Sequence, residues 1–332
     1  MSVTISEAVK YIGVDDKTID LFESQYVVPH GVSYNSYLIL DEKVALMDTV
    51  DARGMEQWEK NLLAALDGRK VDYLIVSHLE PDHAGSIGRL VELFPEVTLV
   101  GNAKTFQMLP QFFDELPVDE NHKITVAEGE SLSLGTHTLN FYMAPMVHWP
   151  EVMVTYESSE KILFSADGFG KFGALDYEDP EGWACEARRY YFNIVGKYGA
   201  PVQALLKKAA GLDIQTICPL HGPVLKENLG YYIGLYDTWS SYKPEDKGVL
   251  VAYASIHGNT AKAARKFAEM LRAKGVEKVS VMDLSRDDMA EVVEDAFRYD
   301  RMVLAAASYD GGVFPCCLLY TSPSPRDLST SR

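Results

Sequence analysis

The stretch DYLIVSHLEPDHAGS, residues 72–86, constrains this chain more than any other, because an apolar run leads directly into four side chains that can bind metal ions. The run YLIV is typical of a strand that is buried on both faces. Side chains that follow such a strand lie in a loop at the edge of a sheet. We therefore expect His78, Glu80, Asp82 and His83 to lie together at that edge and to form a metal site.

Three later segments each place one more candidate ligand after a strand-like run. They are VHWPE with His148, SADGFG with Asp167, and PLHGP with His221. Loops at one edge of a sheet sandwich would bring these side chains to residues 78–83. The other histidines considered are predicted to be ordinary core or surface residues: His30, His122 and His137.

Short strands and helices alternate from the N-terminus to residue 243. The pattern predicts strands in SYNSYLIL and KVALMDTV, which flank the turn DEK, and a helix in MEQWEKNLLAAL. The stretch PEGWACEARRYYFNIVGKYG predicts one helix that begins at Pro180 and ends at Gly199. The polar, proline-containing stretch SSYKPEDKGVL predicts a linker between two domains.

Residues 247–316 follow a different pattern. Strands in GVLVAYAS, KVSVMDL and RMVLAAAS are separated by helices in AKAARKFAEMLRAKG and DDMAEVVEDAFRY. This βαβαβ order is typical of a doubly wound parallel sheet. The hexapeptide SIHGNT opens the first helix, where backbone N–H groups and hydroxyls can bind a phosphate. Ser255, Asn259 and Thr260 supply hydrogen-bond donors, and Gly258 permits the tight turn.

The motif HLEPDHAG resembles that of the metallo-β-lactamase superfamily, in which hydrolases carry HxHxDH. Here the second ligand position holds Glu80 instead of histidine. With this replacement the motif resembles that of the flavodiiron branch of the superfamily. Harder oxygen ligands suit iron that cycles between two oxidation states, and carboxylates supply them here. The resemblance implies an α/β chain with an αββα metallo-β-lactamase-like di-iron domain, residues 1–243, and a partial flavodoxin-like doubly wound parallel sheet, residues 247–316.

The resemblance also implies the ligands and the FMN contacts. One iron would be held by His78, Glu80 and His148, the other by Asp82, His83 and His221, with Asp167 bridging them; some family members leave the histidine at the position of His83 off the iron. The FMN phosphate would lie against Ser255, Ile256, His257, Gly258, Asn259 and Thr260, and the flavin ring against Ser308, Tyr309, Asp310, Gly311 and Gly312. The family usually has SPTYNGG where this chain has AASYDGG, so Asp310 departs from the pattern.

The activity that the resemblance implies is the reduction of O2 to water, of NO to N2O, or of both. Two ferrous ions hold two electrons and reduced FMN holds two more, whereas O2 needs four electrons and two NO molecules need two. The expected donor is a rubredoxin-like carrier or a reduced deazaflavin. In this family a head-to-tail homodimer brings the FMN of one subunit to the irons of the other.

Two other classes of function compete with this interpretation. A zinc-dependent hydrolase of the same fold is disfavoured by Glu80 and by the second domain, and a non-catalytic flavoprotein electron carrier is disfavoured by the complete ligand set. The net charge of −17 argues against a nucleic-acid partner. No segment resembles a signal peptide or a membrane span, and no CxxC spacing occurs, so we predict a cytoplasmic protein with reduced thiols.

The final residues, CLLYTSPSPRDLSTSR, change abruptly to serine, proline and threonine. Their reverse translation resembles a transposase-type sequencing adapter read in frame. Residues 317–332 are therefore predicted to be an adapter-derived tail, with the natural sequence cut near Pro315 or Cys316. On that interpretation this chain would bind FMN poorly, whereas the uncut protein would bind it.

Overall fold

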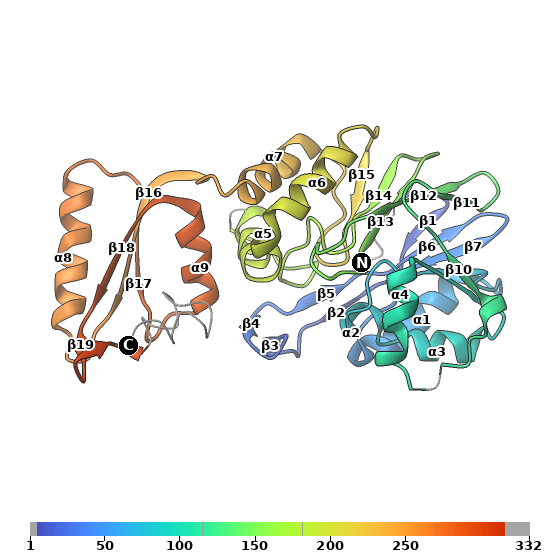
Figure 1. The fold of residues 1–332 in the computed structure, drawn as a ribbon, viewed down its shortest axis with the longest axis horizontal. Coiled ribbons are helices and arrows are strands. Elements are labelled where there is room, and N and C mark those ends of the chain that lie inside the picture. The colour runs from blue at the N-terminus through green and yellow to red at the C-terminus, as the bar shows by residue number, and fades with distance from the viewer. Residues whose placement is uncertain (1–4, 115, 181, 316–332) are drawn as a thin grey trace. The chain divides into compact units, whose positions relative to one another are not determined.

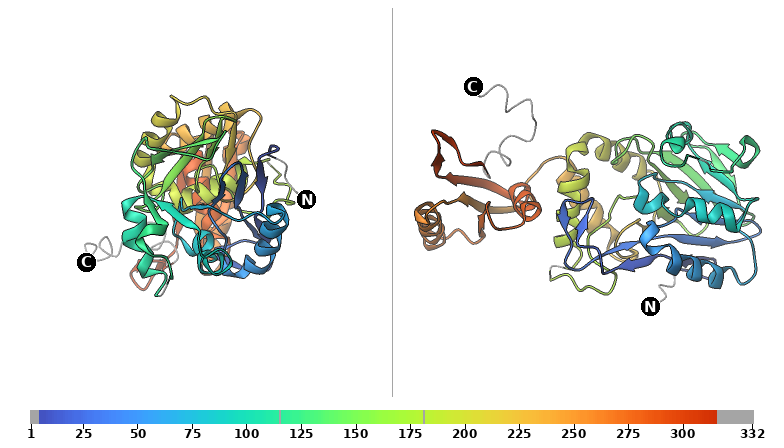
Figure 2. Two further views of the ribbon diagram at one scale, coloured as in Figure 1. Left: turned by 90° about the vertical axis from the view of Figure 1, so that its right-hand side faces the viewer. Right: turned by 90° about the horizontal axis from the view of Figure 1, so that it is seen from below.

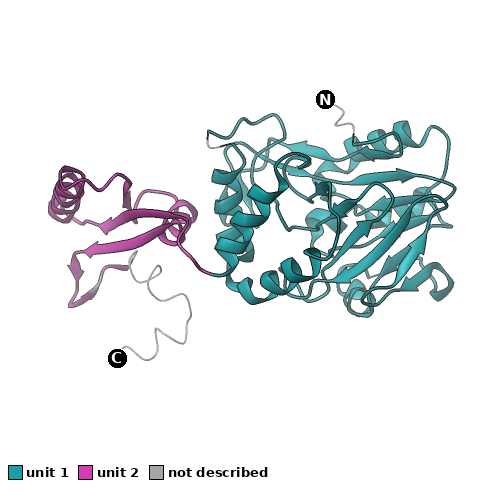
Figure 3. Ribbon diagram, turned by 90° about the horizontal axis from the view of Figure 1, so that it is seen from above, with its two compact units in different colours: residues 1–241 teal, residues 242–332 magenta. Residues whose placement is uncertain are grey.

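The computed structural model describes residues 5–114, 116–180 and 182–315, and the predicted tail 317–332 lies outside them. The chain divides into two compact units, Met1–Ser241 and the part from Tyr242 onward (Figure 3). None of the helices in the described part of the chain combines the length and the apolar character needed to cross a membrane.

Two mixed sheets form the centre of the first unit (Figure 1). Parallel pairing of β14 with β15, and of β7, β8 and β9 with one another, puts the carboxyl ends of those strands at common sheet edges. One sheet has the order β1 (Val9–Tyr11), β6 (Tyr37–Leu40), β7 (Val44–Met47), β8 (Tyr73–Ile75), β9 (Thr98–Gly101) and β10 (Lys123–Thr125). The other has the order β11 (Ser131–Ser133), β12 (Thr138–Met143), β13 (Met153–Glu157), β14 (Ile162–Phe164) and β15 (Thr216–Cys218).

The core of the first unit lies between these sheets. Fully buried side chains from both sheets form one cluster, including Ile39 and Ile75 from the first and Phe141 and Phe164 from the second. Helices lie outside the sheets (Figure 1, Figure 2). They are α1 (Met55–Leu66), α2 (Pro81–Ala84), α3 (Ile87–Leu93), α4 (Ala103–Met108), α5 (Ala184–Tyr190), α6 (Gly199–Ala209) and α7 (Leu229–Ser240). This αββα sandwich confirms the predicted fold of the first domain.

Two small antiparallel pairs of strands lie outside the main sheets. Strand β2 (Val14–Asp16) pairs with β5 (Val32–Tyr34), and β3 (Leu21–Phe22) pairs with β4 (Tyr26–Val27). Phe22 packs edge-on against His221 with ring centroids 5.4 Å apart, so the β3–β4 pair covers one side of the histidine.

The predicted single helix from Pro180 to Gly199 is wrong. Helix α5 ends at Tyr190, a π-helical turn (Tyr191–Val195) and a 3-10 turn (Gly196–Tyr198) follow, and Gly199 begins α6 rather than ending a helix. Pro201 explains the restart, because proline fits the first turn of a helix, where its missing N–H is not needed. The helical periodicity of the sequence did not reveal this break.

The second unit contains a parallel sheet of order β17-β16-β18, from β16 (Asp246–Ala254), β17 (Val279–Asp283) and β18 (Tyr299–Ala306). Helix α8 (Asn259–Ala273) packs on one face and α9 (Met289–Arg298) on the other (Figure 1). A short hairpin, β19 (Ser308–Tyr309) and β20 (Gly312–Val313), follows β18. The predicted doubly wound arrangement is confirmed.

Candidate metal centre

The loop after β8 places its four polar side chains in two groups, because a helix begins in the middle of the motif. Pro81 is the first residue of α2 and Glu80 is its N-cap, so Asp82 and His83 lie in the helical turn. Gly85 ends this turn where a Cβ atom would lie 2.6 Å from the carbonyl oxygen of Pro81 and 2.9 Å from the nitrogen of Ala52. Only glycine permits this close packing of the motif against the 50–52 segment.

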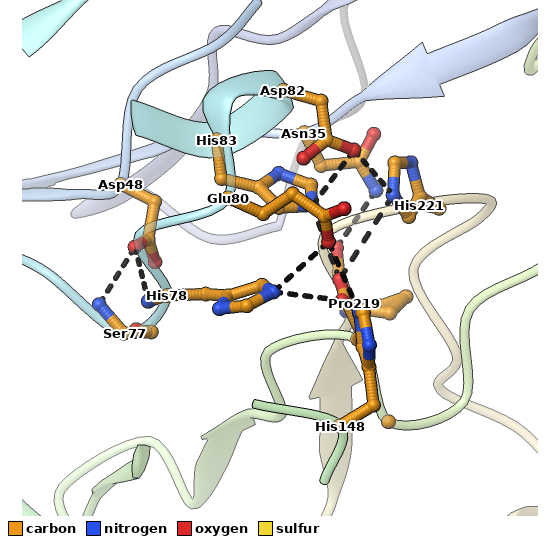
Figure 4. Close-up of polar contacts among 12 residues, drawn as sticks. Asn35, Asp48, Ser77, His78, Glu80, Asp82, His83, His148, Pro219 and His221 are labelled. Atoms are coloured by element: carbon orange, nitrogen blue, oxygen red, sulfur yellow. Dashed lines mark hydrogen bonds and ion pairs between the residues drawn. The ribbon is translucent and has the colours of Figure 1, made fainter. Parts of the chain in front are cut away.

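The remaining candidate ligands come from loops of the second sheet. His148 lies between β12 and β13, Asp167 follows β14, and His221 follows β15. Figure 4 shows the four labelled histidines, His78, His83, His148 and His221, gathered around the carboxylates of Glu80 and Asp82. The structure brings all seven predicted ligands into two sets whose ligand atoms lie within 4.8 Å of one another: His78, Glu80, His148 and Asp167 in one, and Asp82, His83 and His221 in the other.

Asp167 lies between the two sets and faces both. Its Oδ2 is 3.1 Å from Nε2 of His148 and 3.5 Å from Nε2 of His78. Its Oδ1 is 3.1 Å from Nε2 of His83 and 3.9 Å from Nε2 of His221. One carboxylate thus presents a separate oxygen to each group, which is the arrangement of a bridging ligand.

The spacing of the ligand atoms fits a shared ion in each group. Two ligands at about 2.1 Å from one ion lie roughly 3.0 Å apart in octahedral geometry and roughly 3.4 Å apart in tetrahedral geometry. Glu80 Oε2 lies 3.2 Å from Nε2 of His78 and 3.1 Å from Nε2 of His148. Asp82 Oδ2 lies 3.3 Å from Nε2 of His83 and 3.1 Å from Nε2 of His221. The donor set of imidazoles and carboxylates therefore fits a pair of divalent metal ions.

The electrostatics of the site also fit the binding of metal ions. Burial opposes charge on His148, but the carboxylates of Asp167 and Glu80 outweigh it and raise the pKa of His148 to about 9. Burial likewise opposes ionisation of Asp167, yet the imidazoles of His83 and His148 hold the pKa of that carboxyl well below its usual range. A metal ion that binds Nε2 of His148 would have to displace the proton that this raised pKa favours.

Two of the ligand imidazoles are fixed by hydrogen bonds at Nδ1. His221 donates from Nδ1 to the backbone carbonyl oxygen of Ser33 at 2.7 Å, and His78 hydrogen-bonds from Nδ1 to Oε1 of Glu151 at 2.8 Å. A carbonyl oxygen can only accept, so Nε2 of His221 is left free to bind a metal. Among the described residues, Nδ1 of His83 has no partner.

Sequence reasoning missed two residues of this site, Tyr190 and Glu151. Tyr190 is fully buried, and its hydroxyl has no hydrogen-bond partner in the part of the chain that is described. Its ring lies 5.4 Å from that of His221 between centroids, and burial and then the charges of Asp167, Asp82 and Glu80 raise the pKa of Tyr190. No signal within the helical stretch RRYYFN distinguishes this residue. Glu151, three residues after His148 in VHWPE, was the more detectable omission.

The histidines predicted to be ordinary are not among the two clustered sets. His30 stacks on Tyr177 at a centroid distance of 3.7 Å, and His122 hydrogen-bonds to Asp119. His137 connects two hairpins of the first unit, with Nδ1 2.7 Å from Asp41 and Nε2 3.1 Å from Glu160.

The predicted FMN contacts come from loops at the carboxyl ends of two neighbouring parallel strands. The 255–258 loop follows β16, and residues 307–312 follow β18, which lies beside β16. The strand order of the sheet reverses between β16 and β18. In doubly wound folds, ligands bind at the carboxyl ends of the strands where the order reverses. Gly258 has a φ of 82°, and no side chain caps α8 after it. Ser255 Oγ is buried without a partner among the described residues.

The 308–312 segment is a tight hairpin in which Tyr309 pairs with Gly312. Asp310 and Gly311 occupy its turn with φ values of 50° and 77°. An Asp-Gly pair is typical of such two-residue turns. That this hairpin lines a flavin stays a prediction.

Comparison with known proteins identifies relatives that match most of the chain. The family model described as "ODP family beta lactamase" matches residues 32–222. A nitric oxide reductase of Moorella thermoacetica is 32% identical over 325 residues, which are 94% of this chain and 79% of that protein. The diflavin flavoprotein A 1 of Synechocystis is 34% identical over 281 residues, 83% of this chain, but the chain spans only 48% of its length.

Solved structures match both units of the chain. The rubredoxin oxygen:oxidoreductase of Desulfovibrio gigas has a TM-score of 0.87 at 27% identity, over 95% of this chain and 80% of that one. The flavodiiron protein of Giardia intestinalis has a TM-score of 0.89 at 26% identity, over 96% of this chain and 78% of that one.

Proposed function

The chain belongs to the flavodiiron proteins, and from that premise we propose that it is an oxidoreductase that reduces O2 to water, NO to N2O, or both. Relatives named for each reaction support this: a nitric oxide reductase and a rubredoxin oxygen:oxidoreductase. Because the chain covers about half of some relatives and about four fifths of others, activities of their additional parts do not transfer to it.

The observation that carries the proposal is the position of Asp167 between two sets of ligands. Its two oxygens face separate imidazole pairs at 3.1–3.9 Å, as a carboxylate that bridges two metal ions must. We assign one iron to His78, Glu80 and His148, and the other to Asp82, His83 and His221, with Asp167 bridging. A pair of ferrous ions would supply binding positions for the diatomic gas and two of the electrons that reduce it.

The protein's own contribution is to hold these ligands in a dry, fixed arrangement. His78, His83 and His221 are almost completely buried, and aromatic rings pack against two of them. Trp149 lies 5.2 Å from His78, and Tyr190 lies 5.4 Å from His221, between ring centroids. Exclusion of water strengthens the attraction between carboxylates and metal ions and limits side reactions of reduced gas species.

The second unit supports a flavin partner for this chemistry. A phosphate at the uncapped start of α8 would accept hydrogen bonds from backbone N–H groups and from the unpartnered Ser255 Oγ. FMN bound there would supply two further electrons, which the four-electron reduction of O2 requires. The donor that reloads the flavin is of the rubredoxin type or a reduced deazaflavin, and a head-to-tail homodimer would bring flavin and iron of different subunits together.

Glu80 argues against the zinc hydrolase alternative. Its carboxylate lies 3.1–3.2 Å from two imidazoles of the first set, where hydrolases carry a histidine. A harder oxygen ligand favours iron that cycles between its ferrous and ferric states over zinc.

The test combines metal analysis with gas turnover. Protein purified anaerobically from iron-supplemented cells should contain two irons per chain. Chemically reduced protein should consume O2 or NO in anaerobic stopped-flow, and Asp167→Asn should abolish that consumption. Two zinc ions and no gas consumption would replace the proposal with the hydrolase alternative.

A further inference from the structure

The two metal subsites offer the same donors but differ in what lies behind them. Each has two imidazoles and one carboxylate of its own, and Asp167 gives one oxygen to each. Behind His78 stands a carboxylate, Glu151, whereas behind His221 stands a neutral carbonyl, that of Ser33. The two similar ligand sets therefore have different partners behind one of their imidazoles, one charged and one neutral.

Glu151 is held firmly in this position. It is fully buried, and its Oε1 accepts hydrogen bonds from Nδ1 of His78 at 2.8 Å and from the backbone N–H of Leu79 at 2.9 Å. Its backbone carbonyl accepts a hydrogen bond from Nδ2 of Asn102 at 2.6 Å. Its second oxygen, Oε2, has no partner among the described residues. The charge of this carboxylate is consequently directed at one imidazole.

Other carboxyl groups near the site do not reproduce this contact. Asp48 accepts hydrogen bonds from the backbone N–H groups of Ser77 and His78. Glu23 lies beside Glu80 and Asp51 lies near Asp82, so each subsite has one such carboxyl group beside it. In the part of the chain described, none of these three hydrogen-bonds to a ring nitrogen of a ligand.

A carboxylate that accepts the Nδ1 proton of a ligand histidine fixes its tautomer and makes Nε2 a stronger donor. A stronger donor backed by a negative charge stabilises a metal ion in its higher oxidation state. The effect of the Glu151 charge on the metal ion is large here because buried surroundings screen charge poorly.

We propose that Glu151 is a positioning residue that makes the ion held by His78, Glu80 and His148 the more easily oxidised of the two. The centre then has a fixed electronic polarity, in which this subsite loses its electron first and the subsite of Asp82, His83 and His221 second. This inference rests on the proposed di-iron function.

The first experiment is a potentiometric titration of the iron-loaded protein, followed by electron paramagnetic resonance of the mixed-valent state. Wild type should show two separate one-electron couples. Glu151→Gln keeps the size of the side chain and removes its charge, so the couple oxidised first should rise while the other stays. A tenfold change in the ferric to ferrous binding ratio corresponds to about 59 mV.

Glu157→Gln is the matched control. Glu157 is also fully buried, but it lies at the far end of β13. Its donors among the described residues are the backbone N–H groups of Thr138, Ser159 and Glu160. The potentials of the two one-electron couples in Glu157→Gln should match those of wild type. Equal separation of the couples in Glu151→Gln and wild type would overturn the inference, as would an equal shift in the control.

Metal binding by the metal-free protein provides a second readout. Cobalt(II) titration followed by its visible spectrum should show two equivalents in wild type and Glu157→Gln. In Glu151→Gln one equivalent should bind roughly 10- to 100-fold more weakly and the other should be unchanged. Loss of both equivalents, or of neither, counts against the inference.

The outcomes separate failure of this inference from failure of the proposed function. A wild-type protein that binds iron and reduces gas, yet shows one merged two-electron couple, refutes the polarity and leaves the function intact. That measurement needs no variant, so it decides the matter even if Glu151→Gln fails to fold. A wild type that holds no iron refutes the function itself.

Discussion

Replacement of Tyr190 by phenylalanine should stabilise the metal-free protein, which is unusual for a change in a fully buried residue. The hydroxyl of Tyr190 has no partner among the described residues, and an unpaired buried polar group costs about 1–3 kcal/mol. The cavity left by one oxygen atom offsets a few tenths of a kcal/mol at about 24 cal/mol per Å³. The net gain in free energy of unfolding is therefore about 1–2.5 kcal/mol, or about 2–10 °C in Tm for a unit of this size.

Tyr37→Phe provides the matched comparison, because Tyr37 is equally buried but donates a hydrogen bond of 2.6 Å to the carbonyl oxygen of Pro219. That substitution should lower the free energy of unfolding by about 1 kcal/mol. Differential scanning calorimetry of both metal-free variants measures the two changes in stability, and we expect them to have opposite signs.

Metal loading should remove the advantage of phenylalanine at position 190. Solvent or a gas molecule that enters the loaded centre gives the hydroxyl an acceptor, so Tyr190→Phe should then be neutral or destabilising. If Tyr190→Phe lowers the Tm of the metal-free protein as Tyr37→Phe does, the hydroxyl is hydrogen-bonded in that state, and the inference that it is unpaired is refuted.

Three further outcomes follow from the same contacts. Asp167→Asn should reduce the metal content from two equivalents to one or fewer in plasma mass spectrometry, because an amide cannot offer a negative oxygen to each ion; two retained equivalents would contradict the bridge. Burial opposes charge on His137, but Asp41 and Glu160 outweigh it and raise the pKa of His137. A raised pKa gives stability that is present below the unfolded value of about 6.5 and is lost as pH rises through the folded value. Urea unfolding of wild type and His137→Gln should therefore differ by about 1.5–3 kcal/mol near pH 6 and converge at alkaline pH; a constant difference would refute this linkage. Ser255→Ala should weaken FMN binding by roughly tenfold or more and leave riboflavin binding unchanged, as fluorescence quenching can measure; equal loss for both ligands would exclude a phosphate contact.

Much of the fold was predictable because hydrophobic pattern and turn residues agree over most elements. The helix expected in MEQWEKNLLAAL is α1, and the strands around the turn DEK are β6 and β7 in antiparallel register. The break between α5 and α6 was not predictable from periodicity, since a π-helical turn keeps apolar residues at nearly helical spacing. Here the packing of Tyr190 near His221 accompanies an irregular helix that local preference does not indicate.

The candidate ligands were predictable because each one follows a strand, and strand ends gather at a sheet edge. Their supporting residues were harder to predict. A buried phenol such as Tyr190 has no distinctive sequence context, and only its place in VHWPE marks Glu151. Their positions depend on how two sheets and an irregular helix pack, which is information held in long-range contacts.

The origin of the ligands in both sheets has a consequence for how the protein acquires metal. No single hairpin carries a complete set, since His78 and Glu80 come from one sheet and His148 and Asp167 from the other. An unfolded or newly made chain therefore cannot capture iron tightly, and chelation happens only after the sandwich has closed. Bound metal then acts as a cross-link between the halves, so that iron starvation would show itself as faster proteolysis of the chain.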